Sequence, residues 1–144
     1  MDKIKNASFS LVSYEFSEVS MQGVNRPITE TLSISFSTEG LFNEKSSIFQ
    51  LTFGTIVSDK DCNKGPYIKV LCKAQYRFID SISFSEIPDY FYANSIAILF
   101  PYVRAYISLL TTQANQKAVI LPTYNLSSLA SELKNNSVLY NADH

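Results

Sequence analysis

Residues that could do chemistry are scarce in this chain, and their spacing matches no reactive arrangement. Cys62 and Cys72 lack the CxxC and zinc-finger spacings, and the single histidine, His144, is the last residue. A tetrahedral zinc site of cysteine and histidine needs four ligands, and only three such residues exist. Without an internal histidine, activation of a serine or cysteine nucleophile is not expected. We therefore expect no metal and favour Cys72 as a small buried hydrophobic residue, with a disulfide to Cys62 left open.

Carboxylates lie close together in the sequence at two places, where they could act as an acid–base pair or bind a metal. Asp59 and Asp61 stand in a polar segment with two lysines, which favours a solvated loop. Glu86 and Asp89 suit the start of a helix, where acids meet the positive end of the helix dipole. The chain has no glycine-rich phosphate loop and only four glycines, so nucleotide binding is unsupported. The sequence predicts a protein that is not an enzyme and uses no cofactor.

Composition indicates one globular domain of 144 residues. The hydrophobic fraction of 46% is enough to build a core, and the net charge of -1 gives no reason to expect nucleic-acid binding, which needs clustered cations. Lys69, Lys73 and Arg77 share one face of an expected strand and are interpreted as solvated. We expect a single domain over 1–144, with an ordered core of about 7–136 and a flexible C-terminal tail.

The least polar stretch, residues 95–110, is an unsuitable membrane span. Asn94 precedes it, and Pro101, Arg104 and Ser108 interrupt it. An arginine at the centre of a bilayer is costly. The N-terminus has a short basic start but no apolar region of the kind found in signal peptides. The sequence therefore predicts a cytoplasmic protein that does not insert into membranes.

The first two thirds of the chain alternate between apolar and polar residues, which is typical of half-buried antiparallel strands. In the first strand the apolar parity changes near Ser17 and Glu18, which predicts a β-bulge. Gly40 and residues 42–47, most of which are polar, are interpreted as a connection. The four predicted strands lie at residues 12–21, 31–37, 48–57 and 68–78.

The last third changes to a helical period. Pro88 and Asp89 mark the start of a long helix, and Pro101 should kink it. Apolar residues recur at gaps of four and three along one seam, and other apolar residues lie off that seam. One sheet can cover only one side of this helix, so we expect the other side to meet another subunit. The seam consists of Tyr92, Ile96, Leu99, Val103, Tyr106 and Leu110.

After the long helix, residues 118–122 indicate an extended connector. Asn125 can cap a short final helix that carries Leu126, Leu129 and Leu133. Strands grouped before helices predict an α+β fold. The expected architecture is a four-stranded antiparallel sheet packed on a long kinked helix plus a short C-terminal helix.

Residues 98–126 resemble the SecB-type protein-export chaperones. The helix motif of that family is matched by Ile98, Leu99, Phe100, Pro101, Tyr102 and Arg104, and its crossover by Leu121, Pro122, Asn125 and Leu126. Residues 14–27 are similar to the first strand of the family, with a bulged alternation and a loop that bears asparagine and proline. The middle strands agree only in pattern.

The resemblance implies a homotetramer, built as a dimer of dimers, that holds unfolded polypeptides in apolar grooves without ATP. Aromatic residues suit such sequence-tolerant contacts. Expected residues of the subunit interface are Tyr92, Ile96, Leu99, Pro101, Tyr102, Arg104 and Tyr106. Expected client-binding residues are Phe42, placed in a loop, and Leu121, Tyr124, Leu126, Leu129 and Leu133 near the crossover.

The sequence departs from the family in its charge. Family members use acids on the sheet face to dock the ATPase that drives export, and end in an acidic tail. This chain keeps Glu18 but has Gln22 where a second acid is typical, and its tail is nearly neutral. These differences weaken the expectation of docking to that motor.

Two other functions remain open at this stage. The chain could be a dedicated partner-binding chaperone, such as one belonging to a toxin–antitoxin system. It could also be a monomeric module that binds a small ligand between sheet and helix.

Overall fold

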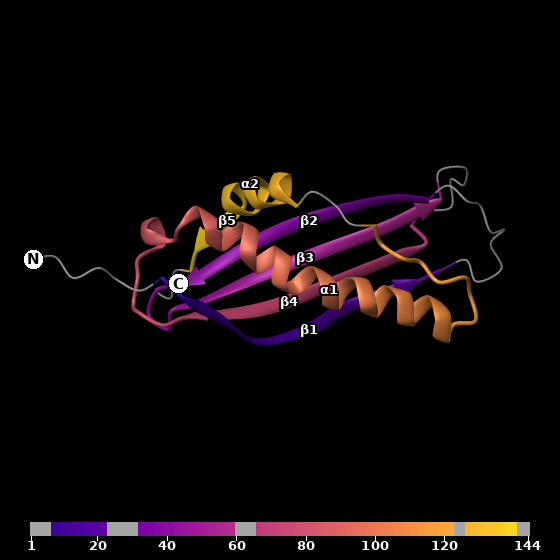
Figure 1. Ribbon diagram of the computed structural model, residues 1–144, viewed down its shortest axis with the longest axis horizontal. Coiled ribbons are helices and arrows are strands. Elements are labelled where there is room, and N and C mark those ends of the chain that lie inside the picture. Colours follow the sequence, from indigo (N-terminus) through magenta and orange to yellow (C-terminus); the bar gives the residue numbers. More distant parts are fainter. Residues whose placement is uncertain (1–6, 23–31, 60–65, 123–125, 141–144) are drawn as a thin grey trace, which may run out of the picture.

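The computed structural model describes residues 7–22, 32–59, 66–122 and 126–140, and the fold is α+β (Figure 1). One layer is a five-stranded sheet, and both α-helices lie on the same face of it. The elements in chain order are β1 (Phe9–Met21), β2 (Leu32–Asn43), β3 (Ile48–Asp59), β4 (Ile68–Phe78), the 3-10 helix η1 (Phe84–Glu86), α1 (Asp89–Gln113), α2 (Ser127–Asn135) and β5 (Ser137–Leu139).

The sheet has the strand order β1-β4-β3-β2-β5. The four long strands pair antiparallel, which confirms the predicted sheet. On β4 every second side chain from Ile68 to Phe78 is buried, as the alternation predicts. Cys72 is among them and is a free thiol, so its interpretation as a small core residue is confirmed. Phe49, Leu51 and Phe53 of β3 are also completely buried.

The predicted bulge in β1 is confirmed. The register of β1 on β4 shifts between Phe16 and Glu18, where the parity of the sequence changes. A second shift, which was not predicted from the sequence, lies between Leu11 and Ser13. Two bulges twist and bend this edge strand, which makes it a poor template for uncontrolled pairing.

Helix α1 crosses the sheet diagonally (Figure 1). One face of it is buried. The predicted seam is confirmed: its first four residues are buried and its last two are half-buried. The Tyr76 hydroxyl donates a hydrogen bond of 2.6 Å to the Ser95 carbonyl, which fixes the helix on β4. The helix runs unbroken through Pro101.

By length and composition alone, α1 could cross a bilayer. Nine of its residues are buried in the described fold, as expected of a core helix. Its first residue, Asp89, accepts a hydrogen bond of 2.7 Å from Lys134 of α2, which joins the two helices. This contact raises the pKa of Lys134, because the Asp89 carboxylate favours the charged amine.

The expected connection after residue 37 is wrong. Strand β2 continues through Gly40 to Asn43, and the turn to β3 takes only residues 44–47. Phe42 therefore lies in a strand rather than a loop and is completely buried. Within the turn, the Asn43 side chain accepts hydrogen bonds from the amides of Lys45 and Ser46, at 3.0 and 3.3 Å.

The expected loose tail is also wrong for residues 137–140. Strand β5 pairs in parallel with β2, and the Tyr140 amide donates a hydrogen bond of 2.7 Å to the Phe42 carbonyl. This adds a fifth strand to the four predicted. The short final helix is confirmed, although Leu126 occupies its N-cap position and the predicted cap, Asn125, lies outside the described residues.

Candidate functional site

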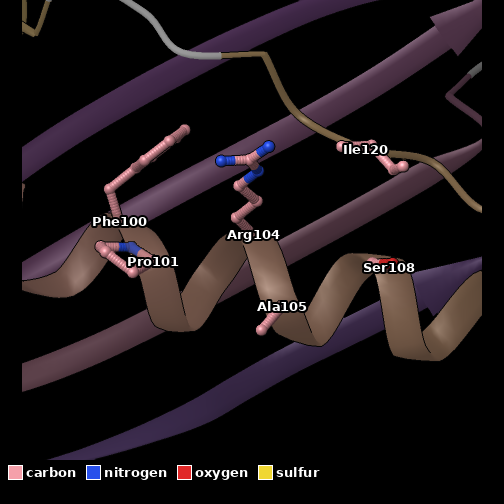
Figure 2. A pocket seen from close by; sticks show the side chains of 6 residues that line it. All are labelled: Phe100, Pro101, Arg104, Ala105, Ser108 and Ile120. Atoms are coloured by element: carbon pink, nitrogen blue, oxygen red, sulfur yellow. The ribbon is translucent and has the colours of Figure 1, made fainter.

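A hollow of about 370 Å³ lies between the second half of α1 and the crossover, residues 114–122 (Figure 2). Residues from two turns of α1 form one side of the hollow. One apolar side chain of the crossover forms the opposite side. Most of these side chains are exposed, so the hollow opens to solvent. Its lining consists of Phe100, Pro101, Arg104, Ala105, Ser108 and Ile120.

Phe100 anchors the helix side of the hollow in the core. Its ring packs edge-on against Phe36 of β2 and Phe53 of β3, with centroid distances of 5.9 and 6.4 Å. The side chain is only 7% exposed, so it forms the innermost part of the lining. The position of α1 over β2 and β3 therefore determines the depth of the hollow.

The extended backbone of the crossover determines which side chain enters the hollow. Val119 and Leu121 are buried, and Ile120 between them is 62% exposed, because side chains of an extended chain alternate in direction. The Val119 amide donates a hydrogen bond of 3.0 Å to the buried hydroxyl of Thr111 on α1. That bond ties the crossover to the helix.

Among the residues that the structure describes, Arg104 is the one charged member of the lining. It makes no hydrogen bond or ion pair with any residue that the structure describes. From Tyr90 to Ser131 the sequence carries two cations, Arg104 and Lys117, and no carboxylate. The stretch of chain that forms the hollow is therefore positively charged, although the whole chain has a net charge of -1.

A second exposed apolar surface lies on the other flank of α1, beside β1. Tyr102 contacts Tyr14 of β1 with ring centroids 4.7 Å apart. Ile98, Tyr102 and Leu109 lie on one stripe of the helix and are 40, 45 and 55% exposed. We call these three residues together with Tyr14 the aromatic ridge. Next to the ridge, the Tyr106 ring stacks on the Phe16 ring with centroids 3.9 Å apart, which fixes α1 on β1.

The structure divides the predicted interface residues into two groups. Tyr92, Ile96 and Leu99 are buried against the chain's own sheet. Pro101, Tyr102 and Arg104 are exposed, and Tyr106 is half-buried. Only the exposed members are free to contact a second subunit, and their role in assembly stays a prediction.

The predicted client-binding residues are mostly part of the core. Leu121 and Leu133 are completely buried, as is Phe42, whose predicted exposure in a loop is wrong. Leu126 and Leu129 are half-buried against the core, and Tyr124 lies outside the described residues. Their role in client binding stays a prediction.

Glu18, the predicted docking residue, is exposed on β1 and pairs with Lys69 at 3.5 Å. This pair lies in solvent, so it contributes little to stability. No group of three or more histidine, cysteine, aspartate or glutamate side chains able to hold a metal is found within the described ranges.

Four residues of the lining were not predicted to belong to a binding site: Phe100, Ala105, Ser108 and Ile120. A usable signal was present for Ile120, since an extended segment with three consecutive apolar residues must expose the middle one when the outer two are buried. The remaining residues are brought together by the path of the crossover, which the sequence pattern does not specify.

Comparison with solved structures gives the same fold as the sequence resemblance. The chain is similar to Rv1957, a SecB-like chaperone of Mycobacterium tuberculosis solved in complex with a ChAD peptide from the Rv1956 HigA1 antitoxin. The TM-score is 0.65 with 15% sequence identity, and the alignment covers 81% of this chain and 88% of that one. At this identity the likeness shows the fold, which is SecB-like.

No family model matches the chain. A search by sequence finds a relative from an archaeon. The relative is the uncharacterized protein MJ0357 of Methanocaldococcus jannaschii, and it is 32% identical over 109 residues. The alignment covers 72% of this chain and 68% of the relative. The chain therefore belongs to the same family as MJ0357.

Proposed function

We propose that this protein is a chaperone that holds non-native polypeptide segments without ATP, and that the hollow is part of its binding surface. The observation that carries the proposal is an open, largely apolar hollow beside α1 of a SecB-like fold. The apolar side chains of the lining, with the nearly buried Phe100 at the base and the exposed Ile120 at the rim, give contacts that depend little on client sequence.

Light scattering of an aggregating client tests this proposal. The protein should suppress aggregation at stoichiometric concentration in a buffer that contains no nucleotide. Ile120→Ser should weaken suppression, because it removes an exposed apolar side chain from the hollow without disturbing the core. A matched control is Ser35→Ala on the exposed face of β2. Equal and complete aggregation with and without the wild-type protein would contradict the proposal.

A second candidate function is that of a dedicated chaperone for one partner. The peptide bound to Rv1957 comes from an antitoxin, and this supports a narrow client range as an alternative. A panel of unrelated unfolded clients separates the two. Suppression of many clients at similar concentrations favours a general holdase, and suppression of none, with tight binding of one specific partner, favours a dedicated chaperone.

The proposal includes a homotetramer in the cytoplasm, with the aromatic ridge in a contact between subunits. Docking of an export motor through Glu18 is the least supported part, because Gln22 stands where a second acid is typical of the SecB-type family and the C-terminal tail is nearly neutral. A small-ligand module predicts a monomer instead. The mass in solution therefore discriminates between these functions.

A further inference from the structure

We infer that the hollow selects polypeptide segments in which apolar side chains stand next to a carboxylate, and that Arg104 binds this carboxylate. The inference rests on the proposed function and adds a chemical preference to it. An apolar hollow alone would bind any apolar segment. A single cation in the hollow favours those apolar segments that also carry a negative charge.

The position of Arg104 suits this role. Its side chain extends from α1 towards the crossover, and Phe100 and Ile120 lie on either side of it (Figure 2). Arg104 stands one helical turn after Phe100 and one turn before Ser108, so the three residues share a side of the helix. A segment lying in the hollow would have its apolar side chains on Phe100 and Ile120, within reach of the guanidinium.

The residues around the hollow carry positive charge and supply no carboxylate to Arg104, so the carboxylate would come from a bound client. The guanidinium group is always charged, and its planar set of donors matches a carboxylate with two parallel hydrogen bonds. No aspartate or glutamate occurs between Asp89 and Glu132, so the part of α1 that lines the hollow and the crossover offer none. Asp89 already pairs with Lys134 in α2. Charge complementarity therefore favours an acidic residue of the client over a basic one.

A bound segment would strengthen the interaction. Apolar side chains that cover the hollow exclude water from the guanidinium, and charge-assisted hydrogen bonds gain strength as water is removed. The Ser108 hydroxyl lies in the same lining, one helical turn after Arg104, and offers a further hydrogen-bond donor to a bound segment. A client with Asn in place of Asp keeps the shape of the side chain but loses most of the free energy of the charge-assisted hydrogen bonds.

Fluorescence anisotropy with matched peptides tests the inference. Two labelled peptides carry the same apolar core, followed by Asp in one and Asn in the other. We expect wild-type protein to bind the Asp peptide about tenfold more tightly, because a hydrogen bond to a charged group contributes more than a neutral one. Arg104→Gln should remove this preference, so that the Asp and Asn peptides bind with similar affinity. Arg104→Glu should disfavour the Asp peptide.

Lys117→Gln is the matched control, since this exposed cation of the crossover is not part of the lining. It should retain the preference. Equal affinity of wild-type protein for both peptides, together with suppression of aggregation, would overturn the inference and leave the proposed function intact. Absence of both peptide binding and suppression would overturn the proposed function as well.

The other occupant that could use Arg104 is a second copy of this chain. If Arg104→Gln lowers the mass in solution while the peptide preference stays unchanged, Arg104 belongs to a subunit contact and the inference is wrong. If the mass is unchanged and the preference is lost, the inference holds.

Discussion

At the scale of single residues, two ionisable side chains of β4 are buried in the core. Cys72 and Tyr76 are both completely buried. Loss of solvation raises the pKa of Cys72 from 9.0 to about 11, with a smaller contribution from the negative charge of Glu15. Burial also raises the pKa of Tyr76, and nearby Cys72 and Tyr102 add to the effect. The native fold therefore keeps both groups neutral at alkaline pH.

These shifts predict a loss of stability at alkaline pH. Below about pH 9 the thiol is neutral in both states, and its contribution to stability is fully present. Between about pH 9 and 11 the unfolded state loses its thiol proton while the folded state keeps it. The free energy of unfolding should therefore fall by about 1 kcal/mol per pH unit in this window.

Urea denaturation at a series of pH values measures this effect. The Cys62→Ser background leaves Cys72 as the only thiol, and Cys72→Ala serves as the control that should weaken the dependence. At neutral pH, Cys72 should react with a thiol reagent only after unfolding, because it is completely buried. A stability that stays flat between pH 9 and 11 would show that these groups ionise as easily in the native state.

At the scale of elements, β5 depends on a position where β2 has no side chain. A Cβ at Gly40 would overlap the Phe49 ring and the Ser137 hydroxyl. The Ser137 hydroxyl donates a hydrogen bond of 2.6 Å to the Leu133 carbonyl at the end of α2. The Asn136 side chain donates to the Thr38 carbonyl at 3.1 Å. Gly40 therefore allows the link between α2 and β5 to lie directly on β2.

Gly40→Ala should destabilise the fold by about 2 kcal/mol, because the added methyl group forces the Phe49 ring or Ser137 to move. Hydrogen exchange should show faster exchange of the Tyr140 amide, which bonds to the Phe42 carbonyl. Ser35→Ala on the exposed face of the same strand is the control and should have little effect. Unchanged stability and unchanged exchange in Gly40→Ala would contradict this account of β5.

Gly40 is also the reason why the end of β2 was predicted wrongly. Glycine is depleted in strands, so a glycine before a polar segment indicates a turn. Here it serves close packing instead, and its misinterpretation placed Phe42 in a loop. Strand β5 has only three residues, too few for an alternation to be visible. Its existence depends on the edge of β2, which is a tertiary property.

Long periodic patterns succeeded for the opposite reason. Burial of one face over many residues constrains a sequence strongly, so β4 and the α1 seam could be predicted. The bulge near Glu18 was predictable because a one-residue slip changes the parity of every following residue. The hollow was not predictable, since it depends on how the crossover returns over the sheet.

At the scale of the whole molecule, α1 separates two surfaces with different chemistry. The flank towards the crossover carries the hollow and Arg104. The flank towards β1 carries the aromatic ridge, where Ile98, Tyr102 and Leu109 are exposed beside Tyr14. The ridge has no charged member, so another apolar surface is the partner that suits it. We therefore expect assembly and client binding to use different flanks of one helix.

The double substitution Ile98→Glu and Leu109→Glu should lower the mass measured by light scattering after size-exclusion chromatography. Two charges in an apolar contact between subunits cannot be hydrated there, whereas on the isolated chain both positions face solvent. Circular dichroism should therefore show an intact fold. A wild-type mass for this variant would show that the ridge is not an interface. Arg104→Gln should keep the wild-type mass, and the two variants together separate assembly from recognition of the carboxylate.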